Sequence, residues 1–194
     1  MNPLLVFISA ALINNYVLTQ FLGMCPYFGV SKRTETALGM GLSVIFVMLI
    51  GSSFTFLFYR FVLVPFNITY LQTIVFILII ASIVQFLEVF IKKMFSTLYT
   101  MLGVYLPLMA TNCAIFGVTL INIQDEHTFI GVIFNSLGAG FGFLLAIILL
   151  AGMHEKYESD KHIPEAFRGF PLALFSAGLM SIAFMGFQGL VFGR

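Results

Sequence analysis

Charged residues are scarce in this sequence. Only 9% of its 194 residues are Asp, Glu, Lys or Arg and 60% are hydrophobic, whereas roughly 25% of residues are charged in a typical soluble domain. The net charge is +1 and no basic cluster is longer than the pairs Lys32-Arg33 and Lys92-Lys93, so the chain lacks an electrostatic footprint for nucleic acid. These shortages exclude a soluble domain and a nucleic-acid-binding protein, and they indicate an integral membrane protein.

Cysteine is also rare, because Cys25 and Cys113 are the only two. Two cysteines are too few for a disulfide scaffold, and both lie in apolar surroundings, so free or metal-bound thiols are favoured over a disulfide. The segment Met1–Pro3 carries no basic residue, and no small-residue cleavage site follows the first apolar run. We therefore predict no removable signal peptide.

Uncharged runs long enough to cross a membrane recur along the chain. A bilayer core about 30 Å thick requires about 20 apolar residues in a helix, and the runs are too long and continuous for barrel strands. We therefore predict an all-α integral membrane protein with six transmembrane helices in one membrane domain, residues 1–194. The helices run approximately over Pro3–Leu22, Thr36–Tyr59, Tyr70–Ile91, Leu98–Ile121, Phe129–Ala151 and Phe170–Leu190.

Basic residues in the connections predict the orientation, because short cytoplasmic connections are enriched in Lys and Arg. The first, third and fifth connections carry seven basic residues, against two on the opposite side, so both termini are predicted outside the cytoplasm. The connection His154–Arg168 is then a solvated cytoplasmic loop. The seven residues are Lys32, Arg33, Lys92, Lys93, Lys156, Lys161 and Arg168, and the two are Arg60 and Arg194.

Each cysteine begins a copy of a short repeat. Cys25–Val30 reads C-P-Y-F-G-V and Cys113–Val118 reads C-A-I-F-G-V, and Leu38–Gly41 (L-G-M-G) is matched by Leu137–Gly140 (L-G-A-G). Pseudo-repeats of about 1–93 and 94–194 would contain three spans each. An odd number makes the halves enter the membrane from opposite sides, as an inverted-topology repeat.

The two matches are 88 and 99 residues apart, so the second half carries an insertion of about eleven residues. We expect this insertion to be a loop that includes Asp125, Glu126 and His127. The G-x-G pairs at Gly39 and Gly138 lie within apolar spans, so they predict close helix packing and not phosphate binding.

The cysteine-bearing segments are too long for simple spans. Met1–Ser31 and Met94–Gln124 each hold 31 uncharged residues, and such a straight helix would reach about 46 Å. Helix-breaking residues lie near both cysteines, so we predict a broken first helix in each half, with Cys25 capping a short helix that begins at Pro26. The breaking residues are Gly23, Pro26, Pro107 and Asn112.

Two thiols at such breaks are candidate metal ligands. Helix N-termini stabilise thiolates, but zinc sites and iron–sulfur clusters usually need four ligands, and the three histidines fall in loops. The missing ligands would come from a second copy or a homologous partner, and four thiolates suit a [2Fe–2S] cluster. Packed structural cysteines, another metal and a disulfide remain alternatives. The histidines are His127, His154 and His162.

Four polar residues near the breaks, and one acid, are further candidates. The polar residues would satisfy unwound backbone or donate hydrogen bonds to the sulfurs, although interhelical hydrogen bonding explains them equally well. Glu88 is the one acid within a predicted span, so it is an ion-pathway candidate. Its spacing from Lys92 also fits a simple i,i+4 pair. The polar residues are Asn14, Asn15, Thr111 and Asn112.

Several segments along the chain match one membrane family. They include Asn14–Leu18, Phe21–Pro26, Val30–Lys32, Glu35–Gly41, Leu106–Leu108, Thr111–Ala114, Phe167–Gly169 and Gly178–Ser181. Through them the chain resembles the A subunits of the Rnf (Rsx) electron-transport complexes. It is also similar, at fewer of these motifs, to the E subunit of the sodium-pumping NADH:quinone oxidoreductase.

The resemblance implies one membrane component of a ferredoxin:NAD oxidoreductase complex that couples electron flow to Na⁺ or H⁺ translocation in the bacterial cytoplasmic membrane. It implies that Cys25 and Cys113 ligate a [2Fe–2S] cluster together with the homologous, inverted E subunit of the Rnf complex. Further implied partners are the subunits on the ferredoxin and NAD side and one that carries a flavin.

Two other functions fit parts of the pattern. A small secondary transporter also uses inverted repeats with broken helices, and a purely structural assembly subunit would need neither cysteine. The sequence holds no NAD or flavin motif, so we expect a relay within an enzyme and no complete active site in this chain.

Overall fold

A computed structural model describes residues 3–13, 15–31, 33–66, 68–94, 106–158 and 169–188. Within these ranges all regular secondary structure is helical, which confirms the all-α prediction. Helices long and apolar enough to cross a membrane cover Thr34–Leu63, Thr69–Met94 and Phe129–Tyr157, and shorter apolar helices cover Leu108–Gln124 and Phe170–Gly186. The start of the predicted span Leu98–Ile121 lies outside the described residues, so six spans remain a prediction.

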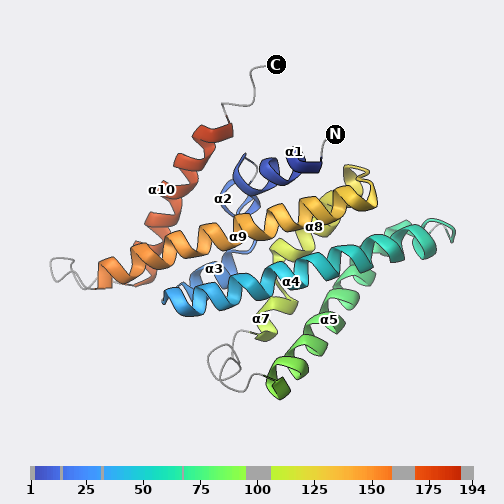
Figure 1. Cartoon of the computed structure of the whole chain (residues 1–194), viewed down its shortest axis with the longest axis horizontal. Coiled ribbons are helices and arrows are strands. Elements are labelled where there is room, and N and C mark those ends of the chain that lie inside the picture. The colour runs from blue at the N-terminus through green and yellow to red at the C-terminus, as the bar shows by residue number, and fades with distance from the viewer. Residues whose placement is uncertain are drawn as a thin grey trace.

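The helices α4 (Thr34–Phe58) and α9 (Phe129–Glu158) form the centre of the molecule, and their mutual contact is the most extensive of any helix pair described. They run antiparallel, side by side (Figure 1). At one end the Thr34 N–H donates to Glu155 Oε1 at 2.9 Å, and at the other the rings of Phe56 and Phe129 lie 6.0 Å apart.

Glycines allow α4 and α9 to approach closely where they cross. A Cβ at Gly41 would lie 3.3 Å from Leu144 Cα, and a Cβ at Gly140 would lie 3.1 Å from Ile45 Cα. The two contacts correspond to each other in the internal repeat. Residues 41 and 140 are 99 positions apart, and so are residues 45 and 144. These reciprocal contacts confirm the close helix packing that was predicted at this repeated motif.

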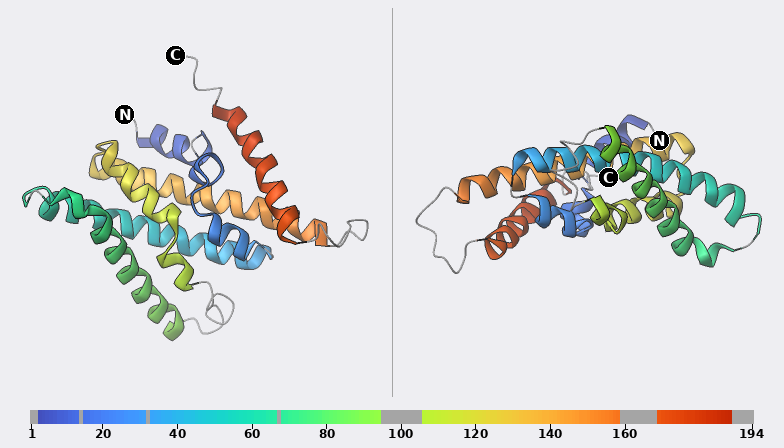
Figure 2. Two further views of the ribbon diagram at one scale, coloured as in Figure 1. Left: turned by 180° about the vertical axis from the view of Figure 1, so that it is seen from behind. Right: turned by 90° about the horizontal axis from the view of Figure 1, so that it is seen from below.

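The remaining helices pack reciprocally on the central pair. The helix α5 (Gln72–Met94) contacts α4 and α7 (Leu106–Ala110), whereas α10 (Phe170–Gln188) contacts α9 and α2 (Tyr16–Gln20). Likewise α4 contacts α8 (Cys113–Gln124), and α9 contacts α1 (Pro3–Ile8) and the π-helix η1 (Ser9–Ile13). The short helices α3 (Met24–Val30) and α8 lie on one side of the central pair (Figure 2).

Burial follows this arrangement. Large side chains such as Tyr27, Phe76 and Phe143 are fully buried between the helices, whereas Phe86 and Phe175 are exposed on the outside of α5 and α10. An exposed apolar surface of this kind is expected where a helix bundle faces lipid.

Several helices extend beyond the approximate spans that were predicted. The second span begins at Thr34 and continues beyond Phe58 as the π-helix η2 (Tyr59–Leu63), and the third begins with a short 3₁₀ turn, η3 (Thr69–Leu71). The fifth continues past Ala151 to Glu158. A count of apolar residues locates the membrane-embedded part, but helical hydrogen bonding continues into water, where Glu155 contacts the start of α4.

Candidate metal centre

The first predicted span, Pro3–Leu22, is interrupted twice. The π-helix η1 ends at Ile13, and α2 starts after Asn15, whose Oδ1 accepts a hydrogen bond from Val17 N at 3.1 Å. Asn15 Nδ2 donates to Gly142 O of α9 at 2.9 Å, so this completely buried side chain joins the interruption to the central pair. Asn15 thus satisfies backbone exposed by the interruption, as N-cap residues do.

The second interruption lies between α2 and α3. Phe21 has a φ of 56° and ends α2, and Gly23, with a φ of 84°, is the N-cap of α3. The prediction that Cys25 caps a helix beginning at Pro26 is therefore wrong, because the left-handed backbone at Gly23 starts the helix at Met24. Pro26 occupies the first turn, where its missing N–H removes no helical hydrogen bond.

In the described part of the second half, a break lies between α7 and α8. Asn112 is the N-cap of α8, and its Oδ1 accepts a hydrogen bond from Ala114 N at 3.0 Å. Asn112 is 1% exposed, and no described residue is a partner for its Nδ2. Cys113 follows as the first residue of α8. Thr111 is exposed and donates to Leu108 O at 3.4 Å, so it belongs to the turn.

The breaks of the two halves meet, and we call this contact the cysteine junction. The Gly23 N–H donates to Cys113 Sγ at 3.2 Å. A Cβ on Gly23 would lie 2.9 Å from Ala114 Cβ, so this glycine is needed for the approach. A Cβ on Gly117 would lie 2.7 Å from Leu22 Cδ1, the end of a side chain that can rotate away. Cys25, two residues after Gly23, is exposed, and Cys113 is partly exposed.

The donor set at the cysteine junction fits half of an iron–sulfur site. Two thiols and a backbone N–H directed at sulfur are the groups that hold and tune such clusters. Among the described residues no three His, Cys, Asp or Glu side chains gather as a metal site. A four-thiolate cluster therefore requires two ligands from another chain, and the exposure of Cys25 leaves the junction accessible to one.

Of the remaining predicted site residues, Glu88 lies on α5 and Asn14 cannot be located. Glu88 is partly buried on α5, one turn before Lys92, near the end of that helix. Its role in an ion pathway stays a prediction. Asn14 lies outside the described residues.

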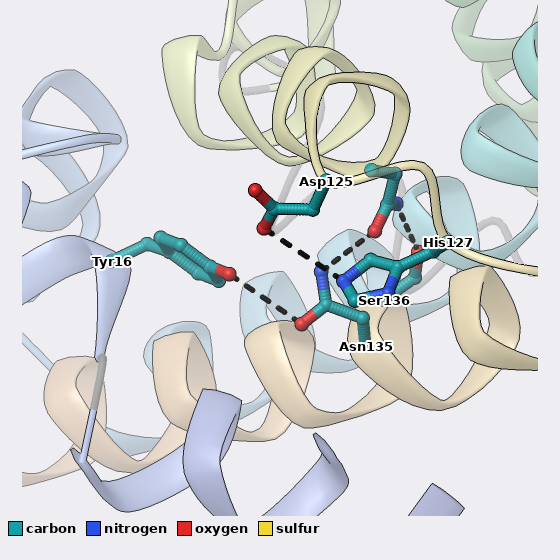
Figure 3. A network of polar contacts seen from close by, with 6 residues as sticks. Tyr16, Asp125, His127, Asn135 and Ser136 are labelled. Carbon is teal, nitrogen blue, oxygen red and sulfur yellow. Dashed lines mark hydrogen bonds and ion pairs between the residues drawn. The ribbon is translucent and has the colours of Figure 1, made fainter. Parts of the chain in front are cut away.

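A polar network that sequence reasoning missed lies between α2, α8 and α9 (Figure 3). Asn135 Nδ2 donates to Asn122 Oδ1 at 2.6 Å, Asn122 Nδ2 donates to Ser136 Oγ at 3.2 Å, and Tyr16 Oη donates to Asn135 Oδ1 at 3.4 Å. The sequence does contain a signal for this network, because Asn122 and Asn135 are amides within apolar runs, and polar groups in membrane helices often mark function.

The chain is similar to known proteins over its whole length. Residues 4–191 match the family model described as Rnf-Nqr subunit, membrane protein. The A subunit of the "Na(+)-translocating ferredoxin:NAD(+) oxidoreductase complex" of Acetobacterium woodii is 54% identical over 193 residues, which cover 100% of both chains. The A subunits of complexes named "Ion-translocating oxidoreductase complex" are 48% identical in Syntrophotalea carbinolica, covering 99% of both chains, and 50% identical in Aeromonas salmonicida, covering 97% of both.

Proposed function

Because the chain belongs to the Rnf-Nqr family of membrane subunits, we propose that it is the A subunit of a complex that couples electron transfer between ferredoxin and NAD to cation translocation. The names of its relatives support this activity. The chain is then one component of a bacterial cytoplasmic-membrane translocase, and the ferredoxin, flavin and NAD sites lie in other subunits.

The electron-carrying group assigned to this chain is a [2Fe–2S] cluster shared with a homologous subunit in inverted orientation. The observation that carries this assignment is the cysteine junction, where the Gly23 N–H contacts Cys113 Sγ and Cys25 lies two residues away. Cys25 and Cys113 would provide two thiolate ligands, and the partner would provide two more. When bound, such a cluster supplies one-electron transfer within the membrane.

This chain's own residues prepare the junction for the cluster. Asn112 starts α8 so that Cys113 is at the positive end of a helix, and the Gly23 N–H offsets negative charge on its sulfur. The buried helices exclude water from one side of the contact, and the exposed Cys25 leaves the other side for the partner.

A six-span inverted repeat is the topology that best supports such a site. The reciprocal contacts of Gly41 with Leu144 and of Gly140 with Ile45 support it, as does the packing of α4 on α8 and of α9 on η1. Both termini and the turn that follows α8 would be extracytoplasmic, because most basic residues lie in the other connections.

The test is Cys25→Ala and Cys113→Ala in the purified, fully assembled complex, with Gly178→Ala on α10 as a matched control. We expect both cysteine variants to lose the electron paramagnetic resonance signal of this cluster and two iron and two sulfide equivalents per complex. The control should lose neither, because a Cβ at Gly178 meets nothing within 4 Å. Co-purification of the other subunits establishes assembly.

A full cluster signal in either cysteine variant would contradict the proposal. A structural assembly subunit predicts that outcome together with intact electron transfer. A secondary transporter predicts that the wild-type chain, purified with its partner, contains no iron at all.

A further inference from the structure

The polar network beside Tyr16 opens onto a pocket. The pocket has a volume of about 390 Å³ and is lined by Tyr59, Arg60, Asn122, Glu126 and His127, among others. Asn122 belongs to both the pocket and the network, because it lines the pocket and is hydrogen-bonded to Asn135 and Ser136. We call this space the end pocket, since it lies where α8 ends and the turn to α9 begins.

Residues in the region of the insertion line one part of this pocket, and residues at the end of α4 and in η2 line the other. The expected eleven-residue insertion was predicted as a loop, but part of it extends α8 to Gln124, and only the residues after it form a turn. Asn122, Glu126 and His127 lie in this part of the chain and line the pocket. The insertion that interrupts the internal repeat thus provides polar residues that line the pocket in the second half.

The charge at the opening suits a cation. Asp125 and Glu126 are exposed carboxylates, and Asp125 Oδ2 lies 3.8 Å from His127 Nε2. Against them the pocket lining has one permanent positive charge, Arg60. With neutral histidine the opening carries a net negative charge, which raises the local concentration of cations.

The network extends from Asn122, which lines the pocket, to Tyr16 at the start of α2. Asn122, Asn135 and Ser136 are each at most 3% exposed. The Tyr16 hydroxyl, which is hydrogen-bonded to Asn135, adds a fourth side-chain oxygen on α2. Tyr16 is the first residue of α2, directly after the interruption at Asn15, and the same short helix leads to Gly23 and its contact with Cys113. Interrupted helices beside polar groups are where membrane transporters hold alkali cations.

Both π-helical segments of the described chain border this route. The π-helix η1 ends at Ile13, two residues before Asn15, and η2 contributes Tyr59 and Arg60 to the pocket. Such segments leave helical hydrogen bonding irregular and occur frequently at functional sites.

We propose that the end pocket and the network form an extracytoplasmic access site for an alkali metal cation, with Na⁺ as its ligand. The side-chain oxygens of Asn122, Asn135, Ser136 and Tyr16 would replace part of the hydration shell. Amide oxygens do not accept protons at physiological pH, so a metal cation suits them better than a proton relay. The inference rests on the proposed function for its role in translocation, but the binding site can be tested separately.

The binding test uses the assembled complex and Na⁺ as the probe. NaCl should raise the thermal unfolding midpoint of the wild-type complex above that in equal choline chloride, because a ligand of the native state stabilises it. Asn135→Leu and Asn122→Leu should raise the half-saturating Na⁺ concentration by about tenfold. Tyr16→Phe, which removes one hydroxyl, should raise it less.

Ser176→Ala is the matched control. Ser176 is also buried, but its hydroxyl donates within α10 to Leu172 O at 2.8 Å, so its removal should leave the Na⁺ dependence unchanged. Asn135→Ser, which keeps an oxygen, should recover part of the wild-type affinity. In proteoliposomes, ²²Na⁺ uptake should fall in the leucine variants while the iron–sulfur signal is retained.

Unchanged half-saturation in the leucine variants would overturn the proposal, and if these fail to assemble, unchanged half-saturation in Tyr16→Phe would do the same. Failure of the proposed function looks different. In that case the wild-type complex lacks the iron–sulfur signal, whereas the Na⁺-dependent unfolding midpoint still reports whether the site exists.

Discussion

Two independent constraints act on Gly23 at the cysteine junction. Its φ of 84° lies in the left-handed region, which costs other residues energy, and the space for a Cβ is already taken by Ala114 and Asn112. The same residue donates its N–H to Cys113 Sγ. Its identity therefore affects both the direction of α3 and the distance between the two halves.

Gly23→Ala should consequently destabilise the chain by about 2 kcal/mol or more, from backbone strain and overpacking combined. The measurement is the thermal unfolding midpoint in detergent, together with the rate at which a maleimide modifies Cys113 in the cluster-free protein, which should rise. Gly178→Ala is the control, because its φ is not positive and nothing lies within 4 Å. Equal midpoints for the two variants would contradict the role given to Gly23.

Single residues show how far the sequence could be interpreted alone. Gly23 and Asn112 were recognisable as helix breakers, since glycine and asparagine favour non-helical backbone by their own chemistry. The N-cap hydrogen bond of Asn15 to Val17 N is local, but its bond to Gly142, 127 residues later, is contained in no local pattern. The start of α3 was misassigned because proline marks a first turn without saying which of its positions it occupies.

At the scale of elements, the crossing of α4 and α9 depends on the same glycine motif twice. The packing around Gly140 is tighter than the packing around Gly41, however. A Cβ on Gly41 would first meet the tip of the Leu144 side chain, which can rotate away, whereas a Cβ on Gly140 would meet Ile45 Cα at 3.1 Å and Cγ1 at 2.9 Å. Backbone atoms and β-branched side chains have little freedom to move.

Gly140→Ala should therefore lower the free energy of unfolding by about 1–3 kcal/mol, and Gly41→Ala should lower it by less. Gly152→Ala lies on the same helix with nothing within 4 Å, so the better helix propensity of alanine should leave stability unchanged or raise it by about 0.5–1 kcal/mol. Denaturant titration of the three variants measures their free energies of unfolding and so the order of the losses. A larger loss for Gly152→Ala than for Gly140→Ala would refute this view of the crossing.

The positions of helices were predictable where the length of an apolar run alone determines them. The long apolar runs of α4, α5 and α9 were found by counting residues against membrane thickness. The interruption at Asn15 and the network around Asn135 were not, because single polar residues in an apolar run barely change its hydropathy. Their partners on other helices decide what they do.

At the scale of the whole molecule, opposite ends of the bundle differ in charge. Lys92 and Lys93 are exposed at the end of α5, and Arg33 is exposed just before α4, whereas Arg60 lies at the other end of α4, beside the end pocket. This distribution predicts that the lysine pair faces the cytoplasm. It also predicts that the turn before α5 faces outward.

Single substitutions can test this orientation in intact cells. A membrane-impermeant maleimide should modify Thr69→Cys in whole cells, and it should modify Lys93→Cys only after the membrane is opened. Both positions are exposed, so access to the reagent depends on the side of the membrane alone. The parent chain measures background from Cys25 and Cys113. Labelling of Lys93→Cys in intact cells would reverse the proposed orientation.

The contacts between the halves also determine when, during synthesis, the first break can reach its final geometry. Asn15 is held by Gly142, and Gly23 contacts Cys113, so the first break reaches its final geometry only after most of the second half has left the ribosome. Until then Asn15 Nδ2 lacks its acceptor, Gly142 O. The contact between Gly23 and Cys113 therefore forms only after Cys113 has been synthesised, and the proposed cluster would be loaded after that step.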